Sequence, residues 1–345
     1  MNGKKTESRV VKNGKLGVGC VITACVLALY VLYCGEAYGQ KFTFQAGSAV
    51  AREAPVGQAL EKFAEAVEKE TKGEVKIRVV HSSALGSLLD MNDQLRTGAL
   101  AMTTFVPSTK ATEDKFFMVD ELPYLWKDMD QDLNACHGDL GKLYKEHASK
   151  LGIHIIGFMP IGYRHLTNNL RPVYKIEDLK GLKIRVAESR PRVEAFQLLG
   201  ISPTPMAFGE LYQALQLGTV DGQENPVSLI YTSKFYEVQK YMSLTKHILS
   251  RFTLGFSLPI WKTLPSNIQN ILEKNAIEIA EKENMRLSKL EEERGVQRLK
   301  EKGMIVNELD ITPFQLALKP FYEKYIPILG PEVRAALNKY TGRGF

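Results

Sequence analysis

The chain has 345 residues, of which 44% are hydrophobic and 24% are charged, and its formal net charge is +6. This length predicts two compact lobes with sizeable cores, and the composition excludes an intrinsically disordered protein. Residues 1–39 contribute +3 of the net charge, so the remainder carries only +3. Such a small excess argues against a nucleic-acid-binding protein, which needs a concentrated basic face.

The N-terminus has the three-part layout of a secretory signal peptide. A cationic stretch ends at Lys15, an apolar run spans residues 16–33, and the small residues Ala37 and Gly39 precede Gln40. This pattern predicts export to the periplasm, with cleavage near Gly39. The apolar run is also nearly long enough to span a bilayer, so a retained membrane anchor is the alternative.

The cysteines and histidines give no indication of a disulfide, a metal site or a catalytic centre. Three of the four cysteines lie before residue 40, which leaves Cys136 without an internal partner. The six histidines lack the spacing of metal ligands, and the chain has no G-x-S-x-G or P-loop motif after the signal segment. We therefore expect no metal, no cofactor and no enzymatic activity.

The first 60 residues of the mature chain alternate between strand and helix patterns. Period-two alternation predicts strands at residues 41–47 and 74–80, and helical stripes follow at residues 55–72 and 88–98. This order favours an α/β fold with mainly parallel strands.

The later elements are read from the same periodicities. Residues 121–151 are predicted to be mostly helical, residues 152–159 a buried strand, and residues 209–218 a helix that leads into a short strand and turn at 219–222. An apolar stripe from Ser266 predicts one very long helix over about residues 266–302, long enough to brace more than one lobe.

The segment GLKIRV, residues 181–186, is a predicted strand with a cation in its middle. Alternation puts Leu182, Ile184 and Val186 on one face and Lys183 and Arg185 on the other. An arginine on such a strand is either solvated or directed into a cleft to hold an anion. The strand pattern alone leaves both alternatives open.

Three motifs around this strand resemble those of one family. They are GYRHLTNNLRPVY, EDLKGLKIRV and LGISPTPMAFGELYQALQLGTVDGQENP, all between Gly162 and Pro226. They are similar to the solute-binding proteins of tripartite ATP-independent periplasmic (TRAP) transporters, DctP type, and the likeness extends through nearly all of the mature chain.

The resemblance implies a two-lobed periplasmic-binding-protein fold of type II-like architecture. Its lobes are joined by crossing strands and braced by the long helix. The implied boundaries are residues 40–161 plus about 251–282 for lobe I, and residues 162–250 plus about 283–345 for lobe II.

The resemblance also implies a receptor rather than an enzyme. It would bind a carboxylate-bearing organic acid in the interlobe cleft and deliver it, as a monomer, to TRAP transporter membrane subunits. Two alternatives stay open: a ligand-sensing subunit for a membrane signalling kinase, and an exported enzyme, which would need a nucleophile, a metal or an acid–base pair.

Five site residues follow from the resemblance. Arg185 is expected to bridge the ligand carboxylate, because a planar guanidinium matches a carboxylate with two parallel hydrogen bonds. Arg164 is a second site arginine or a structural interlobe ion pair, and Asn225 is a ligand contact or a turn residue before Pro226. Gln45 is expected to be a polar ligand contact, and Phe208 packs on the ligand or belongs to the core.

Two departures from the family pattern concern ligand specificity. Sialic-acid-binding members carry a glutamate near residues 103–109, where this chain has none, so sialic acid is disfavoured. Glu188 and Arg190 replace smaller polar residues and would alter the pocket wall if they faced it.

Overall fold

The computed structural model describes residues 42–345. The predicted signal peptide, and the membrane anchor that is its alternative, lie outside the described residues. Within residues 42–345, no helix combines the length and the apolar character needed to cross a bilayer.

The N-terminal half of the sheet contains the predicted alternation of strands and helices. Strand β1 (Phe42–Gly47) pairs in parallel with β2 (Val75–Val80) and with β3 (Met102–Phe105). Helices α2 (Pro55–Glu70) and α3 (Leu88–Thr97) connect them, and Ser87 caps α3 in a capping box with Asp90. The apolar stripe of α2 packs on this sheet, because Leu60, Phe63 and Val67 are fully buried.

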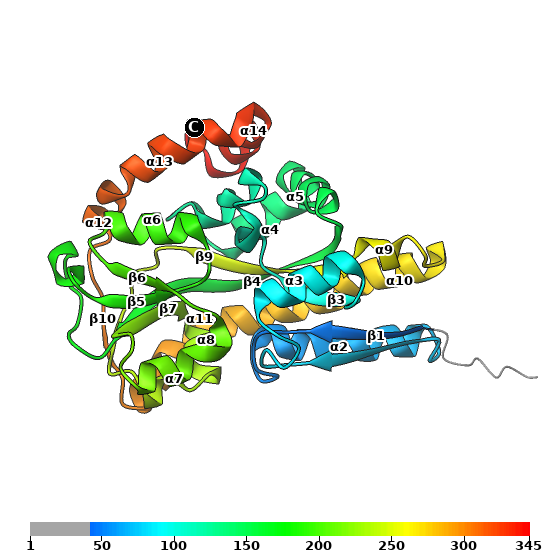
Figure 1. The fold of residues 1–345 in the computed structure, drawn as a ribbon, viewed down its shortest axis with the longest axis horizontal. Coiled ribbons are helices and arrows are strands. Elements are labelled where there is room, and N and C mark those ends of the chain that lie inside the picture. The colour runs from blue at the N-terminus through cyan, green and yellow to red at the C-terminus, as the bar shows by residue number, and fades with distance from the viewer. Residues whose placement is uncertain (1–41) are drawn as a thin grey trace, which may run out of the picture.

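Two long strands join the halves of the molecule. Strand β4 (Ile153–Asn168) runs antiparallel to β9 (Leu249–Ser257) over residues 153–163, and its last five residues pair with β7 (Gly222–Pro226). The resulting strand order is β2-β1-β3-β9-β4-β7-β5-β6, so one twisted sheet crosses the whole molecule (Figure 1). The strand predicted to end at residue 159 therefore continues to Asn168.

The C-terminal half of the sheet adds short parallel strands beside β7. They are β5 (Lys183–Val186) and β6 (Ser202–Pro205), while β8 (Tyr241–Ser243) and β10 (Ile305–Asn307) branch from β4. Helices α6 (Arg190–Leu198), α7 (Leu211–Gln216) and α8 (Val227–Thr232) connect or flank these strands.

The prediction of a turn at DGQENP is wrong for most of that segment. Gly222–Pro226 forms strand β7, in which Asn225 pairs with His165 of β4. Gly222 is required there, because a Cβ atom would lie 1.9 Å from the carbonyl oxygen of Thr167. Polar residues dominate this strand, so apolar alternation could not reveal it.

The predicted long helix is present and follows β4. It comprises α10 (Ser266–Asn275), a π-helical segment (Ala276–Glu281) and α11 (Lys282–Glu301). Glu281 accepts the N–H of Phe158 at 2.6 Å, Asn284 donates to Pro160 O at 2.6 Å, and Glu292 accepts the N–H of Tyr163 at 3.1 Å. These contacts satisfy backbone groups beside the two bulges of β4, so the helix braces the crossing strand.

A helical layer covers one face of the sheet. Helices α4 (Met129–His137) and α5 (Asp139–Lys150) pack under α14 (Gly330–Thr341), with α12 (Thr312–Ala317) and α13 (Lys319–Tyr325) beside α6 (Figure 1). The short helix α9 (Leu258–Trp261) follows β9. Residues 122–128 form turns and bends instead of the expected helix. The predicted division of these helices between the two lobes stays a prediction.

Candidate functional site

A small cavity lies where the two halves of the sheet meet. Its volume is about 60 Å³, and residues of both halves line it. Four of the five predicted site residues are among them: Arg164, Arg185, Phe208 and Asn225.

Arg185 is buried, so the solvated alternative for this strand residue is wrong. Its side chain lies on β5 and is 3% exposed, while Leu182, Ile184 and Val186 are fully buried on the other face as the alternation predicts. Its Nε and Nη2 donate to Met206 O at 2.9 and 2.6 Å, and its guanidinium lies 5.8 Å from the Phe208 ring centre.

The charge of Arg185 lacks a carboxylate partner among the described residues. The guanidinium has five N–H donors, and the Met206 carbonyl occupies only the Nε side, which leaves Nη1 free. Burial lowers the pKa of Arg185 to about 9; the charge of Glu224 opposes this fall, and the charges of Arg164 and Arg192 add to it. An anion in the cavity would supply the missing partner.

Arg164 lines the same cavity but is already paired. It donates to both carboxylate oxygens of Glu224, with one distance of 2.8 Å, and it reaches Asn225 Oδ1 at 2.9 Å and Ser250 Oγ at 3.3 Å. Because β4 and β7 are adjacent strands, this ion pair joins two neighbouring strands of the sheet.

Asn225 and Phe208 reach the cavity from β7 and from the segment after β6. The amide of Asn225 is held at both ends, by Arg164 and by Gln223 Oε1 at 2.5 Å. Phe208 is half-buried and packs edge-on against Phe235 at 5.9 Å, so it serves both the core and the cavity wall.

The structure does not bring three other residues to this cavity. Gln45 on β1 is exposed and does not line it. Glu188 and Arg190 do not line it either; the wall there is Ala187, and Arg190 is exposed and pairs with Glu194.

Sequence reasoning missed two buried arginines in the cavity wall. Arg192 on α6 donates to the two oxygens of Glu121 at 2.8 and 3.0 Å and to Glu224 at 3.1 Å. Arg251 on β9 contacts Asp120 and Asp132 and lies 4.5 Å from the Tyr144 ring centre. A cation inside the apolar strand LSRFTLGFS is the same signal that drew attention to Arg185.

The acidic partners of these arginines balance their charge. Despite burial, Arg164 and Arg192 hold the pKa of Glu224 well below its ordinary value. Burial raises the pKa of Asp132 to about 6 and also raises that of Asp120. Of the four cavity arginines, Arg185 is therefore the one that forms no ion pair with a carboxylate within the described chain.

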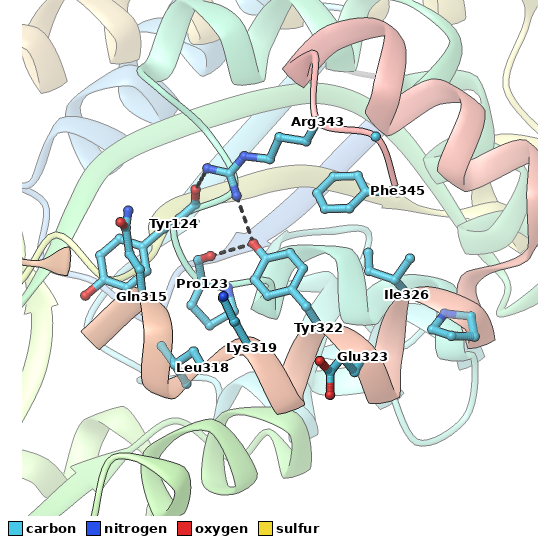
Figure 2. A pocket seen from close by; sticks show the side chains of 12 residues that line it. Pro123, Tyr124, Gln315, Leu318, Lys319, Tyr322, Glu323, Ile326, Arg343 and Phe345 are labelled. Carbon is cyan, nitrogen blue, oxygen red and sulfur yellow. Dashed lines mark hydrogen bonds between the residues drawn. The ribbon is translucent and has the colours of Figure 1, made fainter. Parts of the chain in front are cut away.

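A larger hollow of about 570 Å³ lies under the C-terminal residues, away from these arginines. Figure 2 shows Arg343 reaching the backbone oxygen of Tyr124 and the hydroxyl group of Tyr322, which in turn donates to Pro123 O at 2.5 Å. Because its arginine is engaged and it contains none of the predicted site residues, we do not assign the ligand to it.

A family model and a curated protein match most of the chain. The model described as bacterial extracellular solute-binding protein, family 7 (DctP), matches residues 46–327. The C4-dicarboxylate-binding periplasmic protein DctP of Rhodobacter capsulatus is 31% identical over 335 residues, which cover 94% of this chain and 98% of that protein.

Solved structures share the fold. A TRAP periplasmic solute-binding protein from Bordetella bronchispeptica, with density interpreted as pantoate, superposes with a TM-score of 0.82 at 29% identity, covering 87% of this chain and 98% of that one. The sugar-acid-binding protein of Advenella mimigardefordensis, in complex with galactonate, gives 0.84 at 27% identity, covering 88% and 98%.

Proposed function

Because this chain belongs to family 7 of the bacterial extracellular solute-binding proteins, the DctP family, we propose that Arg185 binds the carboxylate of an organic acid in the cavity between its two lobes. The TRAP family and the two-lobed α/β fold predicted from the sequence are confirmed. The family consists of solute-binding proteins that act in transport, not of enzymes.

The observation that carries the proposal is that Arg185 forms no ion pair with a carboxylate within the described chain. A buried cation without an ionic partner is costly, and a ligand carboxylate removes that cost by accepting two parallel hydrogen bonds. Of the two structures described above, one has density interpreted as pantoate and the other is a complex with galactonate, and the Rhodobacter relative is named for C4-dicarboxylates. The feature common to these ligands is a carboxylate.

The other cavity residues take supporting roles in the proposal. Arg164 fixes Asn225, whose amide edge lines the cavity, and Phe208 packs beside the Arg185 guanidinium. Arg192 and Arg251 hold the wall together through their acidic partners. Gln45 has no role here, because it lies outside the cavity.

A thermal-shift screen against organic acids, followed by calorimetry, tests the proposal. A ligand that binds the folded state alone raises the melting temperature. Arg185→Ala leaves the ligand carboxylate unpaired, which costs about 3–5 kcal/mol and weakens binding by roughly two to three orders of magnitude. Arg185→Lys keeps the charge but loses the planar fork, so it recovers only part of that loss.

Arg190→Ala is the matched control, since Arg190 is nearby in sequence, exposed and outside the cavity. It should bind like the parent protein. A folded Arg185→Ala variant that binds the acid within about threefold of the parent affinity would mean that another residue binds the carboxylate.

The proposal also includes export of the protein to the periplasm and delivery of the ligand to membrane subunits. The charge and hydropathy layout of residues 1–39 supports export with cleavage near Gly39, and family membership supports delivery to TRAP membrane subunits. N-terminal sequencing of periplasmic protein tests the first step: a chain that begins near Gln40 supports it, and a membrane-bound chain that begins at Met1 supports the anchor.

A further inference from the structure

The charges around the cavity fit a ligand with one carboxylate. Arg164, Arg192 and Arg251 are each held by buried acids, so Arg185 alone can receive a ligand carboxylate without breaking an existing ion pair. Asp120 also lines the cavity, and its Oδ2 has no hydrogen-bond partner in the described structure. A second ligand carboxylate near it would meet a like charge.

The rest of the cavity wall is mainly apolar. Nine of the seventeen lining residues carry aliphatic or aromatic side chains, including Val50, Val106 and Leu229. A ligand hydroxyl group that leaves water for such a wall loses its hydrogen bonds without replacement.

Few polar groups in the wall are free to serve ligand hydroxyls. Asn225 accepts from Arg164 and donates one N–H to Gln223, and Ser250 accepts from Arg164, so the second N–H of Asn225 and the O–H of Ser250 are the donors that remain. Ser108 also lines the cavity, and Asp120 Oδ2 has no hydrogen-bond partner within residues 42–345. The wall can therefore serve a few ligand hydroxyl groups, and its apolar part leaves others in the row of hydroxyls of a sugar acid without partners.

The size of the cavity also favours a small ligand. A volume of about 60 Å³ is room for about four to six water molecules, on the basis of one water for each 10–15 Å³. A short acid fits such a space more easily than a six-carbon polyol.

We propose that the ligand is a compact monocarboxylate with an apolar, branched or short aliphatic body and few hydroxyl groups. This inference rests on the proposed carboxylate site at Arg185 and adds the class of acid. It separates this chain from the relatives described above that are named for a dicarboxylate or hold a sugar acid.

Calorimetry with four probes tests the ligand class. We expect 3-methylbutanoate and 2-hydroxy-3-methylbutanoate to bind at least about tenfold tighter than succinate and D-galactonate. Equal or tighter binding of succinate or galactonate would overturn the class and leave Arg185 as the anchor. If none of the four binds, the class is overturned, and the broad acid screen then decides separately on the carboxylate site.

A single substitution that keeps the side-chain volume nearly constant tests whether the apolar wall sets the ligand class. Val106→Thr replaces a methyl group with a hydroxyl, so it should weaken 3-methylbutanoate binding by about fivefold and narrow the preference over galactonate. Val306→Thr on β10 is the matched control, because Val306 is half-buried in a strand but does not line the cavity. The proposal fails if the folded Val106→Thr variant keeps the full preference of the parent.

Discussion

Arg164 on β4 donates to both carboxylate oxygens of Glu224 on the neighbouring strand β7, and both side chains are buried. Arg185, one strand further along the sheet, meets only a backbone carbonyl. Two arginines in one cavity wall therefore have different physical roles. The first holds the fold through an ion pair, and the second, in our proposal, pairs with the ligand carboxylate.

We predict that Arg164→Met destabilises the folded protein by about 3 kcal/mol, because it leaves a buried carboxylate with one partner fewer. Arg192 and His247 still contact Glu224, which keeps the loss from being larger. Urea denaturation measures the change. The double variant Arg164→Met/Glu224→Gln should recover part of it, and a folded Arg164→Met variant of parental stability would contradict the assigned role.

The second prediction concerns Glu292 at the bulge of β4. Burial raises the pKa of Glu292 to about 7 from an ordinary value of 4.5, although the Tyr163 N–H and the charge of Lys246 oppose the rise. Between these two values the folded state binds more protons than the unfolded state. Stability therefore falls as the pH rises through this window and levels off above it.

Glu292→Gln should remove this dependence, since the amide oxygen still accepts the Tyr163 N–H but carries no charge. We expect the variant to gain on the order of 2 kcal/mol over the parent at pH 8 and little at pH 5. Denaturation curves at several pH values provide the measurement. Glu293→Gln, on the exposed face of the same helix, is the control and should follow the parent.

The third prediction concerns Cys136, the free cysteine of the described chain. Its thiol is buried on α4, and burial raises its pKa well above the ordinary value, so the reactive thiolate is scarce at neutral pH. Alkylation by iodoacetamide should be at least about a hundredfold slower in the folded protein than in urea. Fast labelling of the native protein would show that α4 opens readily.

The sequence predicts the elements whose apolar periodicity is strong. Helix α2 and strands β1, β2 and β5 lie within one or two residues of the expected bounds, because each presents a clear apolar face to one core. Strand β7 was missed because its buried residues are polar and pair with β4 and with site groups. Its place depends on contacts far along the chain, which local pattern does not record.

The sequence predicts only part of the site, because the partners of its arginines lie far away along the chain. Arg185 stands out as a cation in an apolar strand, and the family motif assigns it a role. The partners that distinguish it from Arg164, Arg192 and Arg251 come from remote segments such as Glu121 and Asp132. Which of four arginines forms no ion pair with a carboxylate follows only from the folded chain.

The last prediction is closure of the lobes around the ligand. Arg164 and Arg185 are 6% and 3% exposed, so a solute reaches them only when the lobes separate. The strands that cross between the halves are β4 and β9, and β4 carries two bulges beside the bracing helix, where small rotations can be absorbed. A ligand that contacts both halves favours the closed form, because only that form makes all the contacts.

Small-angle scattering should therefore show a smaller radius of gyration when an acid that binds in the calorimetric screen saturates the parent protein. Arg185→Ala at the same ligand concentration should keep the scattering profile of the ligand-free protein, because it lacks the contact that brings the carboxylate into the cavity. Arg190→Ala, in which the cavity is unchanged, should compact like the parent. Identical profiles for the parent with and without saturating ligand would mean that the solute enters a cavity whose walls do not move, and the clamp would have to be abandoned.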